Sequence, residues 1–100
     1  MDNVLNKRIA SLFLNEFELF RNILAALPNH INADIIKFNI HKIRPSLIIF
    51  ELDALLEKYE SLANRKKEGE VLSEEDKAFI EITQETDSKI NLIREFTQSI

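Results

Sequence analysis

Apolar residues in the first quarter of the chain recur at steps of three and four, the spacing that places side chains on one face of an α-helix. The residues of this stripe are Leu5, Ile9, Leu12, Phe13, Phe17, Phe20, Leu24 and Leu27. Pro28 and Asn29 follow it, and a proline cannot continue the hydrogen-bond ladder of a helix. The pattern therefore predicts a helix over residues 3–27, either continuous or broken into a short and a long piece.

Two further helical stripes occupy the middle of the chain, and no glycine or proline separates them. The first stripe consists of Ile36, Ile40, Ile43, Leu47 and Phe50. The second consists of Leu52, Leu55, Leu56, Tyr59, Leu62 and Ala63. Either Asn29 or Asn32 is suited to cap the helix that carries the first stripe. We expect the joint between the two helices near residues 50–52, and Gly69 as the C-terminal stop of the later one.

The last part of the chain opens with residues that favour the start of a helix. Ser73 can cap it, Asp76 lies three residues later in an arrangement close to a capping box, and acidic side chains suit a helix N-terminus. The predicted buried stripe is Phe79, Thr83, Thr86, Ile90, Ile93, Thr97 and Ile100. The residues expected to widen this face are Ile80, Ile82, Leu92 and Phe96. A fourth helix is therefore predicted to begin at Ser73.

Four amphipathic helices with short connections predict an all-α fold, an antiparallel up-down four-helix bundle. The 100 residues suit one domain, spanning residues 1–100. The single glycine and two prolines are too few for the tight turns of an all-β fold.

Composition removes several classes of function. The absence of cysteine excludes disulfides, thiolate catalysis and sulfur-ligated zinc. The net charge of −4 disfavours nucleic acid as a partner, because binding phosphate needs an excess of cations. Continuous apolar runs such as residues 47–50 are far too short to span a membrane, and the N-terminus lacks the apolar stretch of a signal peptide. We therefore expect a cytoplasmic protein.

One histidine does not belong to a core stripe. At about 100° per residue, His41 falls roughly 140° from the centre of the stripe of its helix, so it should face water. Lys37 precedes it by one turn and Arg44 follows it by one turn. Neighbouring cations favour the neutral, nucleophilic imidazole and can attract an incoming phosphoryl group. His41 is therefore the candidate phosphoryl acceptor, whereas His30 reads as a plain loop residue.

Pro45 lies one turn after His41, where it has no N–H to donate to the histidine carbonyl. A proline costs about 3 kcal/mol inside an ordinary helix. The helix should therefore either bend there or end and restart with Pro45 in its first turn. Phe38, Ile48 and Ile49 lie nearby on the outward side, either as a docking patch or covered by the N-terminal part of the first helix.

The run His41-Lys42-Ile43-Arg44-Pro45-Ser46 resembles the H-x-[LI]-[KR]-G-[ST] motif of histidine-containing phosphotransfer (HPt) domains. The long helix before it and the leucine-rich helix after it also resemble those of that family, so the likeness covers nearly the whole chain. The sequence departs from the family pattern at two positions. Pro45 replaces the usual glycine, and Glu51 stands where a second glycine is often found before the third helix.

The resemblance implies that the chain is a phosphocarrier rather than a turnover enzyme. His41 matches the phosphorylated histidine, Arg44 the lysine of the motif and Ser46 its small hydroxyl residue, and we add Lys37 to the reacting group. The residues expected to contact a partner are Phe38, Lys42, Pro45 and Ile48. The implied partners are the receiver domains of response regulators and a hybrid sensor histidine kinase. The chain should be a monomer without a metal or cofactor of its own, since Mg²⁺ is expected only on the receiver.

Two alternatives remain open at this point. The chain can be an HPt-like docking module that binds a receiver without accepting phosphate, or a structural or oligomerising bundle. Other chemistries have little support. A di-iron bundle needs Glu-x-x-His pairs, and Leu27 and Phe38 stand three residues before the two histidines. A single glycine cannot form a glycine-rich phosphate loop.

Overall fold

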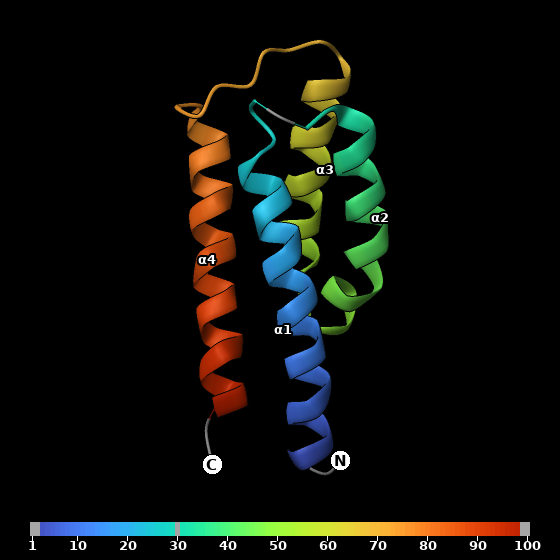
Figure 1. Cartoon of the computed structure of the whole chain (residues 1–100), viewed down its shortest axis with the longest axis vertical. Helices are drawn as coiled ribbons and strands as arrows, with labels where there is room; N and C mark the ends of the chain where they lie inside the picture. The colour runs from blue at the N-terminus through green and yellow to red at the C-terminus, as the bar shows by residue number, and fades with distance from the viewer. Residues whose placement is uncertain (1–2, 30, 99–100) are drawn as a thin grey trace.

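The computed structural model describes residues 3–29 and 31–98, with side chains described from residue 7 onward, and these residues form four helices and no strand. The helices are α1 (Asn3–Ala25), α2 (Ala33–Ile49), α3 (Asp53–Lys67) and α4 (Lys77–Gln98). They run alternately up and down the long axis of the molecule (Figure 1). The predicted all-α four-helix bundle is confirmed. His30 and Ile100 lie outside the described residues.

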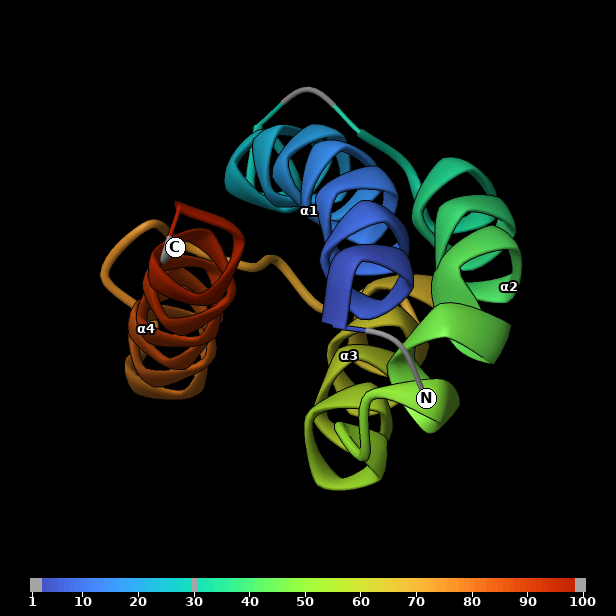
Figure 2. The same ribbon diagram turned by 90° about the horizontal axis from the view of Figure 1, so that it is seen from below.

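The helices occupy the four corners of the bundle when it is seen along its axis (Figure 2). Each helix packs against the next in the chain, and α4 packs against α1. None of the helices in the described part of the chain is long and apolar enough to cross a membrane.

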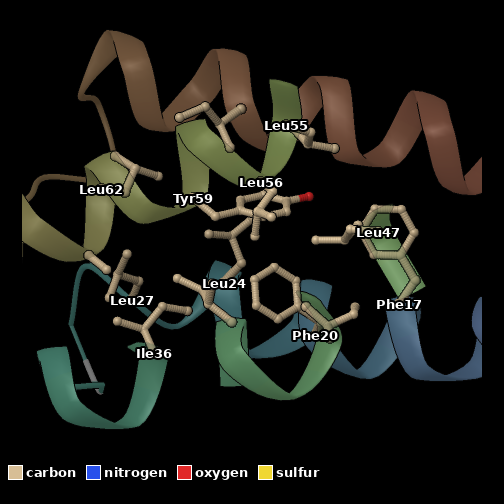
Figure 3. Close-up of a cluster of buried hydrophobic side chains, with 14 of the residues drawn as sticks. Phe17, Phe20, Leu24, Leu27, Ile36, Leu47, Leu55, Leu56, Tyr59 and Leu62 are labelled. Atoms are coloured by element: carbon tan, nitrogen blue, oxygen red, sulfur yellow. The ribbon is translucent and has the colours of Figure 1, made fainter. Parts of the chain in front are cut away.

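Tyr59 of α3 lies at the centre of the core, among leucine and phenylalanine side chains from three helices (Figure 3). Its ring centroid is 4.7 Å from that of Phe20 on α1. Its hydroxyl lies 2.6 Å from the Oγ1 atom of Thr86 on α4, so the buried polar groups satisfy each other. Burial raises the pKa of the Tyr59 phenol. Near the α2–α3 turn, the rings of Phe13 and Phe50 stack with centroids 4.5 Å apart.

The first three helices end close to the predicted positions. The predicted end of the first helix is wrong by two residues, because α1 stops at Ala25 and residues 26–29 form a turn. No break interrupts α1. Asn32, rather than Asn29, caps α2, its side-chain oxygen accepting a hydrogen bond from the Ile35 N–H at 2.9 Å. The joint between α2 and α3 lies at residues 50–52, as predicted.

The predicted start of the fourth helix is wrong. The helix begins at Lys77, and its cap is Asp76, which accepts a hydrogen bond from the Phe79 N–H at 3.1 Å. Ser73 instead accepts a hydrogen bond from the N–H of Glu75 within a turn. Asp76 prevails because Arg65 on α3 holds its carboxylate, with nitrogen–oxygen distances of 3.1 and 2.5 Å, and lowers its pKa to about 2.

Several apolar residues predicted to be buried are exposed. They are Ile9, Leu12, Ile80, Leu92 and Phe96. In the same part of the molecule, α1 and α4 extend beyond the α2–α3 turn, so the ends of these two helices have fewer neighbouring helices to cover them (Figure 1). A stripe read from the sequence identifies a helical face, but the lengths of the neighbouring helices decide how much of that face is covered.

Both ends of α3 meet a residue with positive φ. Glu51 has φ of 60° and Gly69 has φ of 86°. After α2, the N–H of Leu52 bonds the carbonyl of Leu47 and the N–H of Glu51 bonds that of Ile48, at 2.8 and 3.0 Å. This is a Schellman motif, in which the left-handed position favours glycine. Glu51 therefore occupies a strained position, and it is the one where the HPt pattern often has glycine.

Candidate functional site

His41 lies on the rim of a groove of about 270 Å³ between α2 and α3. The residues that line the groove are Lys37, Ile40, His41 and Arg44 from α2 and Glu60, Ala63 and Asn64 from α3. Ile40 and Ala63 form its buried floor, and the small side chain of Ala63 leaves the space beside the imidazole open. The predicted outward direction of His41 agrees with its exposed position.

Two cations flank the imidazole, one turn away on either side. The Nη1 atom of Arg44 lies 3.6 Å from the Oε1 atom of Glu60 across the groove, and both side chains are about half exposed. Lys37 makes no ion pair or hydrogen bond within the described residues. No side chain in residues 7–29 or 31–98 hydrogen-bonds to the His41 ring. Among the described side chains, the groove therefore offers an imidazole and an ammonium without partners, and one loosely paired guanidinium, to a ligand.

The wall of the groove on α3 was not predicted from the sequence. Glu60 and Asn64 line the same groove as His41 because α3 runs antiparallel to α2 (Figure 1) and presents residues one turn apart along the same side. Ala63, between them, was predicted only as part of a buried stripe. Its small size among leucines and a tyrosine is the feature of the sequence that could have indicated a hollow at this point.

Two of the predicted site residues lie on another side of α2. The hydroxyl of Ser46 donates to the Oε2 atom of Glu16 on α1 at 3.5 Å, away from the groove. Lys42 lines a separate hollow between α1 and α2, together with Glu16 and Asn39. The structure thus brings His41, Lys37 and Arg44 together but leaves Ser46 and Lys42 outside their groove.

An exposed apolar strip runs along the outward side of α2, before and after His41. Phe38 is 67% exposed, Ile48 is 48% exposed and Ile49 is 71% exposed. Pro45 is exposed between them. The described side chains of α1 do not cover this strip, so it is open to a partner.

Pro45 lies within α2, which continues to Ile49 without a break. Of the two expected outcomes, the bend is the one that fits, since the last turn leaves the line of the preceding turns (Figure 2). The carbonyl of His41 has no N–H four residues later to accept from. The helix therefore lacks one regular backbone hydrogen bond beside the imidazole.

A larger hollow of about 480 Å³ lies between α1 and α4. Its charged side chains neutralise one another: Arg21 holds both carboxylate oxygens of Asp87, at 2.8 and 3.1 Å, and Arg94 holds Glu18 at 2.6 Å. Unlike the groove beside His41, this hollow contains no imidazole, and its cations are already occupied.

The groove beside His41 can supply a nucleophile and positive charge to an anionic group. No group of three or more histidine, aspartate and glutamate side chains that could hold a metal ion occurs within residues 3–29 and 31–98. Comparison of the chain with protein-family models, with curated proteins and with solved structures finds no match.

Proposed function

We propose that this chain is a cytoplasmic histidine phosphotransfer protein that carries a phosphoryl group on His41 between aspartates of two receiver domains. One observation carries the proposal: an exposed imidazole stands midway along a bundle helix, in a groove flanked by Lys37 and Arg44. The resemblance of residues 41–46 to the HPt motif supports the same function.

In the transfer step, a nitrogen of the neutral imidazole attacks the phosphorus of an aspartyl phosphate on the receiver. The nitrogen–phosphorus bond forms while the bond between phosphorus and the aspartate oxygen breaks, and the carboxylate leaves. The positive charges of Lys37 and Arg44 stabilise the negative charge of the phosphoryl group during transfer. This matters because phosphoryl transfer depends on positioning and electrostatics. Mg²⁺ bound to the receiver supplies further positive charge, and a second receiver takes the group by the reverse step.

Docking requires a surface that brings the receiver's aspartate to the imidazole. Phe38 and Pro45 lie about one turn from His41, and Ile48 and Ile49 lie about two turns from it. This strip exposes apolar area of the kind that protein interfaces bury. The donor receiver would belong to a hybrid sensor histidine kinase and the acceptor to a response regulator. We propose that the protein acts as a monomer.

The proposal is tested by incubating the protein with receiver domains phosphorylated with ³²P. We expect acid-labile, alkali-stable label on the wild type, complete loss of label in His41→Gln, and wild-type labelling in the matched control His30→Gln. Because His41 is exposed, His41→Gln should keep the helical content and thermal midpoint of the wild type.

Two other results would replace the proposed function. Binding to receivers without any label would indicate a docking module, which the proline in place of the glycine of the motif favours. A molecular mass that rises with concentration, together with no receiver binding, would indicate an oligomerising bundle.

A further inference from the structure

The carboxylate of Glu60 is out of place in a groove that receives a phosphoryl group. It lines the same groove as His41 and lies 3.6 Å from the guanidinium of Arg44. Lys37, the other cation of the groove, has no such partner within the described residues. Glu60 therefore engages one of the two cations that a phosphoryl group on His41 would need.

The distance and exposure show that this pair is easily exchanged. A separation of 3.6 Å is longer than a good charge-assisted hydrogen bond, and both side chains are about half exposed to water. Exposed pairs of this kind contribute little to stability. A phosphoryl group carries more negative charge than a carboxylate and three acceptor oxygens, so it would take Arg44 from Glu60.

We infer that Glu60 competes with the phosphoryl group for Arg44 and so shifts the transfer equilibrium from His41 toward the receiver aspartate. This inference rests on the proposed function and adds a regulating residue to the same site. In the unloaded protein Glu60 holds Arg44. In the loaded protein Arg44 turns to the phosphoryl group, and Glu60 loses its partner beside a second negative charge. The loaded state is thereby disfavoured.

The bonds exchanged are the same as in the proposed function. The nitrogen–phosphorus bond of phosphohistidine breaks, and a bond from phosphorus to the receiver's aspartate oxygen forms. Glu60 makes no bond to phosphorus and transfers no proton. It acts only on the relative stability of the two phosphorylated proteins, so it is a positioning residue for Arg44.

The experiment measures the share of ³²P on this chain at equilibrium with one receiver, approached from both directions. In Glu60→Gln, which keeps the shape of the side chain but removes its charge, we expect the ratio of phosphohistidine to aspartyl phosphate to rise about three- to tenfold. The matched control is Glu57→Gln, the same change of charge at an exposed position of α3 outside the groove, and it should leave the ratio unchanged.

A second pair of variants tests whether Glu60 acts through Arg44. In an Arg44→Ala background, Glu60→Gln should raise the ratio less than it does in the wild type, since the group for which Glu60 competes is gone and only its direct repulsion of the phosphoryl group remains. The same rise in both backgrounds, or no rise in either, would overturn the inference. Absence of label on wild-type His41 would overturn the proposed function and this inference with it, whereas a labelled wild type that Glu60→Gln does not alter would remove the inference alone.

Discussion

Two grooves of this bundle contain similar residues but arrange them differently. Between α1 and α4, Arg21 and Arg94 each hold a carboxylate at 2.6–2.8 Å. Between α2 and α3, the single ion pair of the groove joins Arg44 to Glu60 at 3.6 Å, and Lys37 has no partner within the described residues. The first groove uses its charges to join two helices, whereas the second leaves positive charge beside an imidazole.

The two hollows also differ in size and in how freely their cations can meet an anion. The α1–α4 hollow is the larger, at about 480 Å³ against about 270 Å³. Its guanidinium groups are already satisfied, so an anion would have to displace a carboxylate that is well placed. In the α2–α3 groove an anion gains cations at little cost, because the existing pair is long and exposed.

The test with the largest expected effect compares alanine substitutions of two arginines, one from each groove. Arg44→Ala should slow labelling of His41 by about tenfold or more, the value of one charge-assisted contact, while changing the free energy of unfolding by less than about 0.5 kcal/mol. Arg21→Ala should do the reverse. It should leave the labelling rate unchanged and lower the free energy of unfolding by up to about 1 kcal/mol.

Labelling kinetics with a phosphorylated receiver and urea unfolding of the same samples give both quantities. If Arg21→Ala slowed labelling as much as Arg44→Ala does, the functional distinction between the two grooves would be lost.

A substitution in the α2–α3 turn should stabilise the protein while leaving the charged residues of the groove unchanged. Glu51→Gly should raise the free energy of unfolding by about 0.5–1 kcal/mol, because glycine accepts the left-handed conformation that Glu51 adopts at φ of 60°. The labelling rate should stay at the wild-type value, since Glu51 does not line the groove. As a control, Glu57→Gly inside α3 should destabilise by about 0.5–1 kcal/mol. A destabilised Glu51→Gly would contradict the strained turn.

The smallest expected effect is on stability in acid, and it depends on a tightly paired carboxylate that lies outside the groove. Arg65 lowers the pKa of Asp76 to about 2, from an ordinary value of 3.8. The folded state therefore binds fewer protons than the unfolded state, and the stability that this group contributes is lost as pH falls from about 4 through about 2. Urea midpoints of the wild type should decrease across this range. Asp76→Asn should begin lower and decrease less, and an equal decrease in both proteins would exclude Asp76 as the cause.

Predictions from the sequence succeeded where periodicity alone decides the outcome. The spacing of the apolar residues predicted the ends of α2 and α3 to within a few residues. Helical winding of α2 predicted that His41 faces outward. The predictions failed where two residues compete for the same structural role. Ser73 and Asp76 both suit a helix N-terminus, and Arg65, eleven residues earlier in the chain, selected Asp76.

The sequence by itself determined the class of fold, the direction of His41 and the cations one turn from it, because each depends on spacing within a single helix. The tertiary structure alone decided the opposite wall of the groove, the hold of Glu60 on Arg44 and the turn of Ser46 toward α1. Those features depend on how antiparallel helices are aligned, and periodicity within one helix carries no information about that alignment.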